Sequence, residues 1–110
     1  GVAVEVVGGV RTERDIVVQV VFESGTSSEA ALLDVRRAIV AFVNRLKPRS
    51  EDTVQGALAR AQAVLTPGLV EHAVRTVPRV VGVTVVTPAA AEVPEVGEVI
   101  RTSLGRVTAT

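Results

Sequence analysis

The chain carries one histidine, and this side chain is the first candidate for acid–base or metal chemistry. Glu71 stands beside His72 in the sequence, and on a helix Leu69 and Arg75 would be its facing neighbours. A zinc or general-base site needs further His, Cys or carboxylate groups at a suitable spacing, and His72 lacks them. We therefore expect His72 to be a surface or boundary residue, and we predict no metal site.

Three other patterns could carry chemistry, and each has a simpler interpretation. Glu92, Glu95 and Glu98 lie close together in a connector that contains proline, which favours a solvated loop over a calcium or general-acid site. Gly8 and Gly9 lack the context of a phosphate-binding loop and are typical of a turn. The serines fall at helix caps or turns, outside any nucleophile elbow. The sequence therefore predicts no enzyme and no catalytic, cofactor-binding or metal-binding residues.

The charge balance argues against a nucleic-acid partner. The chain has 12 basic and 12 acidic residues and a formal net charge of zero, so no positive surface is expected. Phe22 and Phe42 are its only aromatic residues, which leaves little surface for base stacking. No apolar run approaches the roughly 18 residues that a membrane span needs, so we also expect no membrane insertion.

Length and composition favour one domain without cross-links. A chain of 110 residues is long enough for a single hydrophobic core, and we expect one domain over residues 1–110. The absence of cysteine means that folding does not depend on an oxidising compartment. The chain also lacks methionine, and we expect it to be a part of a longer protein.

The elements that would position any site begin with two predicted strands. Residues 2–7 alternate apolar with other side chains, and residues 15–23 have the β-branched density of a buried strand. We predict a β-hairpin from these two segments, with its turn in residues 8–14. On the second strand one face carries Ile16, Val18, Val20 and Phe22, and we expect the helices to cover it.

After the second predicted strand, the spacing of apolar residues changes to that of helices. A helix is predicted at about residues 27–46, where Thr26 and Glu29 have the spacing of a capping box and Pro48 lies beyond the end. A second helix is predicted from Ser50 onward. A third, shorter helix is predicted with Thr66 as its cap and proline at its first position. The side chains expected to join the helices to the sheet are Leu32, Val35, Ile39, Phe42, Val54, Leu58 and Val74.

The end of the chain returns to strand character. Residues 79–87 form a predicted strand with Val81, Val83 and Val85 on one face, and residues 88–95 form a connector. Residues 96–110 read as a two-stranded ribbon turning at Gly105. This order predicts an α+β fold, a two-layer sandwich of a mainly antiparallel sheet with two or three helices on one face.

From residue 15 to residue 110 the features resemble the C-terminal region of baseplate J-like proteins from contractile phage tails and related injection systems. "DIVVQVVFESGTSSEAALLDVRRAIVAFVNRLKP" is similar to that family's strand, Ser-Gly turn and helix. "LVEHAVRTVPRVVGVTVVTP" is similar to its helix, turn and strand, and "VGEVIRTSLGRVTAT" to its terminal ribbon. Arg79 departs from the family, which usually has glycine after the proline, and "QGALARAQAVL" lengthens the helical middle.

The resemblance implies a structural wedge component that joins neighbouring subunits of a tail baseplate, assembled in the bacterial cytoplasm and located in the virion tail. Its partners would be other baseplate or tail subunits or further copies of itself, in a homo-oligomer or a larger assembly. The terminal ribbon would then be an assembly edge, or else it completes the domain's own sheet. The candidate edge residues are Arg101, Arg106, Val107, Thr108, Ala109 and Thr110.

A second resemblance covers only about the first 45 residues. The predicted hairpin and first helix are similar to those of the alkaline-shock protein family. This alternative implies a cytoplasmic or membrane-associated bacterial interaction module rather than a tail component.

Overall fold

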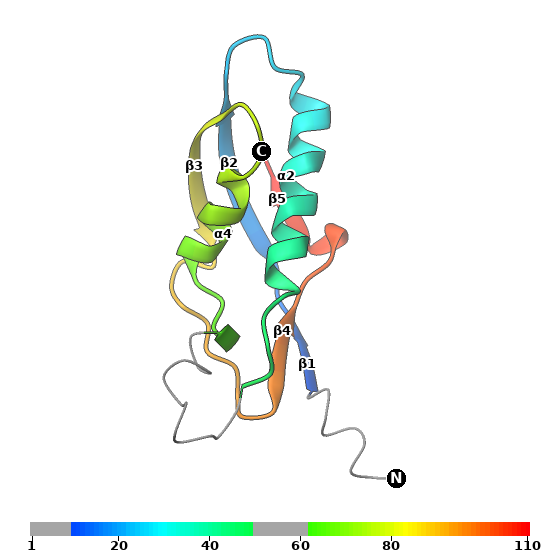
Figure 1. Cartoon of the computed structure of the whole chain (residues 1–110), viewed down its shortest axis with the longest axis vertical. Helices are drawn as coiled ribbons and strands as arrows, with labels where there is room; N and C mark the ends of the chain where they lie inside the picture. The colour runs from blue at the N-terminus through cyan, green and yellow to red at the C-terminus, as the bar shows by residue number, and fades with distance from the viewer. Residues whose placement is uncertain (1–9, 50–61) are drawn as a thin grey trace.

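The computed structural model describes residues 10–49 and 62–110. Two helices and a 3-10 turn lie among five strands in the described part of the chain (Figure 1). In chain order the elements are β1 (Val10–Glu13), β2 (Ile16–Phe22), α2 (Ser28–Val43), α4 (Pro67–Arg75), β3 (Val80–Thr87), β4 (Glu98–Arg101), the 3-10 turn η1 (Leu104–Arg106) and β5 (Val107–Ala109).

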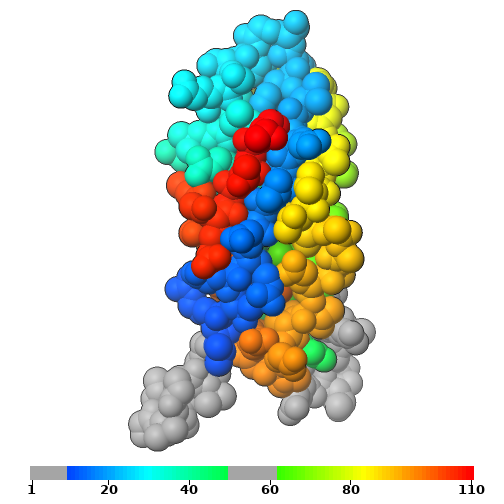
Figure 2. All heavy atoms as spheres, turned by 180° about the vertical axis from the view of Figure 1, so that it is seen from behind, coloured from blue at the N-terminus to red at the C-terminus, as the bar shows by residue number. Residues whose placement is uncertain are grey.

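The described strands form two sheets with mixed pairing. The larger sheet has the order β3-β2-β5, in which β2 pairs antiparallel with β3 and parallel with β5. The smaller sheet joins β1 and β4 in parallel. Helices α2 and α4 lie on one side of the larger sheet (Figure 1), and its three strands are at the surface when the molecule is seen from behind (Figure 2). The predicted α+β fold with helices on one face is confirmed.

The predicted turn before β2 is wrong. Residues 10–13 form β1, which pairs with β4 from Val10 opposite Glu98 to Glu13 opposite Arg101. A strand of four largely polar residues has no apolar alternation that would mark it, and its partner lies at the far end of the chain. The other predicted hairpin strand, residues 2–7, lies outside the described residues.

The two helix starts differ in how well local sequence predicts them. The Thr66 hydroxyl accepts a hydrogen bond from the amide of Leu69 at 3.0 Å, and Pro67 opens α4, as predicted. The capping box at Thr26 is wrong, because Ser27 holds the cap position of α2 and the Thr26 hydroxyl bonds to none of the described residues. The predicted second helix from Ser50 lies largely outside the described residues.

The core lies between the helices and the larger sheet. Ile16, Val18, Val35, Ile39 and Val74 are fully buried, which confirms the predicted inner face of β2 and the inner stripes of both helices. The predicted core residues Leu32 and Phe42 are only half-buried, and Val54 and Leu58 lie outside the described residues. Aliphatic side chains therefore fill the described core.

The predicted face of β3 is wrong at one position. Val83 and Val85 are half-buried against the core, whereas Val81 is 55% exposed. The register between β2 and β3 shifts between Val21 and Phe22, so an extra residue on β3 breaks the alternation at Val81. Single-residue bulges depend on the partner strand, and local periodicity does not mark them.

The turn into β3 has an unusual backbone. Arg79 has a φ of +70°, the left-handed conformation that glycine adopts without steric cost. The Arg79 carbonyl accepts a hydrogen bond from the amide of Glu23 at 2.8 Å, which ties the turn to the end of β2. None of the described helices is long and apolar enough to cross a membrane.

Candidate assembly site on the three-stranded sheet

The last residues of the chain join its own sheet. β5 pairs with β2, with Ile16 opposite Val107. The ladder continues past β5, because Thr110 accepts a hydrogen bond from the amide of Val20 at 2.8 Å and donates one to the carbonyl of Val18 at 3.1 Å. Of the two alternatives that the sequence leaves open, the structure contains the intramolecular pairing.

The predicted terminal ribbon is divided between the two sheets. β4 pairs with β1 and β5 pairs with β2, while Gly105 lies in the η1 turn between them. Two consecutive strands with a glycine between them commonly form a hairpin, so the local pattern predicts the wrong partner for each. Both strands instead pair with segments near the beginning of the described chain.

The outer edge of β5 is partly covered by an arginine from α2. The Arg36 guanidinium donates from Nε to the Val107 carbonyl at 3.1 Å and from Nη2 to the Leu104 carbonyl at 2.6 Å. The Val107 amide bonds to the Leu104 carbonyl within the turn. Val107 thus has partners for both main-chain groups inside the chain. No local pattern marks this contact, because Arg36 and Val107 are 71 residues apart.

Replacing Arg36 with methionine is expected to loosen β5. The change removes two charge-assisted hydrogen bonds while keeping much of the apolar stem, and should lower the free energy of unfolding by about 1–3 kcal/mol. Amide hydrogen exchange at Thr108 and Thr110 should accelerate. The matched control is Arg37→Met, a change at the exposed neighbouring position of α2. Equal exchange rates in the two variants would show that Arg36 does not hold β5.

The two predicted edge arginines make contacts within the chain. Arg106 lies 2.9 Å from Glu13 and 3.0 Å from Asp15, and hydrogen bonding to Asp15 followed by attraction to Glu13 raises the pKa of Arg106. Arg101 donates to the carbonyl of Leu46 at 2.8 Å, and burial lowers the pKa of Arg101. Both residues help to connect the terminal segment with the rest of the fold.

The four remaining predicted edge residues divide between the two sides of the sheet. Val107 is buried and Ala109 is half-buried against the core, whereas Thr108 and Thr110 are exposed on the opposite face. Only part of the predicted edge is therefore accessible in the described structure.

The Glu98 side chain, at the start of β4, forms hydrogen bonds with the preceding loop and with β1. Its carboxylate accepts from the amide of Glu95 at 2.7 Å and from the hydroxyl of Thr12, on β1, at 2.9 Å. The hydrogen bond from the Glu95 amide, then that from Thr12, lowers the pKa of Glu98, with attraction to Arg14 a smaller cause. Both bonds favour the ionised carboxylate.

Glu98 should make stability depend on pH in acid. A carboxyl whose pKa is lower in the folded state stabilises the fold fully above its unfolded pKa, about 4.3, and loses this effect as the pH falls through the folded value. The unfolding free energy of the parent should therefore fall relative to that of Glu98→Gln as acid is added. Urea unfolding at a series of pH values measures this, with Glu71→Gln as an exposed control. A parent–variant difference that does not change with pH would contradict the assignment.

The other glutamates of the predicted loop do not share a site with Glu98. The Glu92 carboxylate forms an ion pair with Arg14 at 2.7 Å, and the Glu92 main chain forms an isolated β-bridge with Leu65. Glu95 contacts Glu98 through its main-chain amide rather than its carboxylate. Within residues 10–49 and 62–110, no three His, Cys, Asp or Glu side chains gather as a metal site would require.

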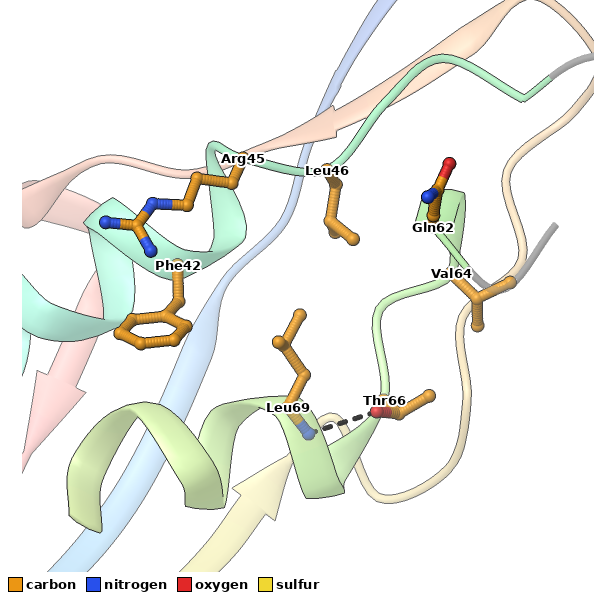
Figure 3. A pocket seen from close by; sticks show the side chains of 7 residues that line it. All are labelled: Phe42, Arg45, Leu46, Gln62, Val64, Thr66 and Leu69. Carbon is orange, nitrogen blue, oxygen red and sulfur yellow. Dashed lines mark hydrogen bonds between the residues drawn. The ribbon is translucent and has the colours of Figure 1, made fainter. Parts of the chain in front are cut away.

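His72 contacts the end of α2. Its ring meets that of Phe42 edge to face, with centroids 5.5 Å apart, and the Arg45 guanidinium lies 4.9 Å from the centre of the Phe42 ring. Figure 3 shows Phe42 at one side of an open hollow of about 540 Å³ between the end of α2 and the start of α4. The lining is mainly apolar, and is formed by Phe42, Arg45, Leu46, Gln62, Val64, Thr66 and Leu69.

The face of the larger sheet opposite α2 and α4 is at the surface of the described fold, where β3, β2 and β5 lie side by side (Figure 2). Successive side chains of a strand point to opposite faces, so the neighbours of the buried residues face outward. Val21 is 61% exposed there and Val86 is 44% exposed. Within β2, β3, β5 and the adjoining Thr110, the exposed side chains of this face are uncharged, and they are Gln19, Val21, Thr84, Val86, Thr108 and Thr110. The exposed Glu23 borders the face just beyond the end of β2.

Comparisons of the chain with protein-family models, with curated proteins and with solved structures found no match.

Proposed function

We propose that this domain is a non-catalytic structural subunit of a baseplate in a contractile phage tail or a related injection system. It acts through protein–protein contacts with neighbouring subunits. On this proposal it is assembled in the bacterial cytoplasm and resides in the tail.

The observation that carries the assembly role is the outer face of the larger sheet, which no described helix covers and whose strands expose only uncharged side chains. Protein interfaces are depleted of charged residues at their centres. Val21 and Val86 expose apolar surface among hydroxyl and amide side chains that can hydrogen-bond to a partner. A nucleic-acid partner would need positive charge on this face, and β2, β3 and β5 carry no lysine or arginine.

The baseplate assignment rests on the resemblance of the sequence, and one backbone feature supports it. Arg79 stands where baseplate J-like proteins usually have glycine, and it adopts the left-handed conformation that glycine favours. The turn therefore keeps the geometry that the family's glycine would provide, although the residue differs.

The test is to locate the chain in tail particles. Cells that produce contractile particles and encode this chain would be lysed, and the particles purified by sedimentation and labelled with gold-conjugated antibody against the chain. We expect the label at the baseplate end of the tail. Unlabelled particles, with the chain confined to the free-protein fraction, would refute the proposal.

A further inference from the structure

β3 has one hydrogen-bonding edge without a partner among the described strands. In β2, Val18 and Val20 direct main-chain groups toward Thr110 on the β5 side. Main-chain groups alternate in direction along a strand, so those of Gln19 point the other way, toward β3. β3 is the outer strand of the sheet on that side.

The same alternation identifies the free groups on β3. Gln19 lies opposite Thr84, so the main-chain groups of Thr84 point toward β2. Those of its neighbours Val83 and Val85 therefore point away from the sheet. Neither residue has a backbone partner on that side within residues 10–49 and 62–110.

The edge carries few of the features that protect natural edge strands from pairing, which are short length, lysine, proline, inward-pointing charges and β-bulges. The register shifts leave an extra residue on β3 at Val81 and at Val86, but the stretch from Gly82 to Val85 between them pairs regularly with β2. β3 has eight residues, VVGVTVVT, none of which is charged and none of which is proline. Val81 adds a side chain that is 55% exposed beside this edge. Unpaired backbone groups and uncharged side chains fit an extended strand as the occupant.

We propose that β3 pairs antiparallel with β3 of a second copy, so that the two larger sheets become continuous. This inference rests on the proposed function and deepens it by naming the contact between copies. A two-fold axis at Thr84 sets Val83 of one copy opposite Val85 of the other, and each such pair exchanges two main-chain hydrogen bonds. No charged residue of β3 meets a like charge across the contact.

The second copy is favoured over an unrelated strand because the edge is complementary to itself. The free groups of Val83 and Val85 lie on either side of Thr84, so the two-fold axis satisfies all of them at once. The contact is small, and we expect a dissociation constant in the micromolar range rather than an obligate dimer.

The position on the axis provides a sharp test. Thr84 of each copy would face its counterpart as a non-hydrogen-bonded pair, in which side chains come closest. Thr84→Lys and Thr84→Glu should each weaken dimerisation by about tenfold or more, because like charges then stand opposite one another. Mixing the two variants should restore a heterodimer. Sedimentation velocity over a concentration series of the full chain measures the dimerisation of the parent, of each variant and of the mixture.

The matched control is Gln19→Lys, which places the same charge on the same face but one strand inward, opposite Thr84. We expect this variant to dimerise like the parent. A parent that stays monomeric throughout, equal weakening by Gln19→Lys, or failure of the mixture to recover would each overturn the strand pairing. Because the particle experiment reads location alone, a chain found in baseplates yet monomeric in isolation would reject this inference and leave the proposed function standing.

Discussion

Replacing Ile39 with alanine is expected to lower the free energy of unfolding by about 2–5 kcal/mol. Ile39 is fully buried on the inner side of α2, between the sheet and α4. The truncation removes buried methyl and methylene groups and leaves a cavity that the surrounding aliphatic side chains fill only in part. Urea unfolding of the parent and the variant measures the difference.

Phe42→Ala is the informative comparison. Phe42 is among the core residues that the sequence predicts, and its truncation to alanine would cost about 3–5 kcal/mol if the ring were fully packed. The ring is only half-buried and borders the hollow of Figure 3, so we expect a cost below about 3 kcal/mol and below that of Ile39→Ala. The exposed control Arg37→Ala should stay within about 0.5 kcal/mol of the parent. A larger loss from Phe42→Ala than from Ile39→Ala would contradict the described core.

Replacing Asn44 with alanine is expected to lower the free energy of unfolding by about 2–4 kcal/mol. The Asn44 side chain, just beyond α2, pairs with the main chain of Thr102 as a neighbouring strand would. Its Nδ2 donates to the Thr102 carbonyl at 3.1 Å, and its Oδ1 accepts from the Thr102 amide at 2.9 Å. Thr102 is buried, so alanine leaves both main-chain groups without this partner.

Asn44→Asp tests the two hydrogen bonds separately, because it keeps the acceptor and removes the donor. The aspartate can still accept from the Thr102 amide, but it offers no donor to the Thr102 carbonyl, and its charge faces that carbonyl oxygen. We expect it to be destabilised as well, which thermal and urea unfolding would report. If Asn44→Ala unfolds within about 0.5 kcal/mol of the parent, the bidentate contact does not hold the segment between β4 and β5 in place.

Local signals in the sequence predict the elements better than their partners. The helix start at Thr66 follows from a cap and a proline within three residues, and the inner face of β2 follows from its alternation. Both depend on interactions within a few positions of the chain. These are the features that periodicity and capping chemistry specify directly.

Contacts distant in the sequence explain the errors. β1 is a strand because β4 pairs with it. β5 pairs with β2 rather than with β4, its predicted partner in the terminal ribbon. The strand pattern at the end of the chain predicts a candidate edge there, yet in the larger sheet of the described structure Arg36 partly covers the outer edge of β5, and β3 is the outer strand on the other side. A strand pattern indicates that a segment can pair, whereas the topology decides which edge stays free.

The side-chain contacts that hold the terminal segment cannot be predicted from neighbouring residues in the sequence. Arg36 is unremarkable on a helix surface until the fold brings Leu104 and Val107 to it. The same holds for Asn44, whose partner Thr102 is 58 residues away. Side chains that bind main-chain groups of distant segments carry no spacing signal, so mutagenesis of these positions tests the structure rather than the sequence pattern.

A cysteine at Thr84 tests the association through β3 most directly, because the chain has no cysteine of its own. In a non-hydrogen-bonded antiparallel pair the Cα atoms lie about 4.5 Å apart, which a disulfide can span. Under mild oxidation at micromolar concentration, Thr84→Cys should form a covalent dimer, whereas Gln19→Cys, one strand inward, should remain largely monomeric. Equal dimer yields from the two variants, or no dimer from Thr84→Cys, would contradict the pairing of β3 between copies.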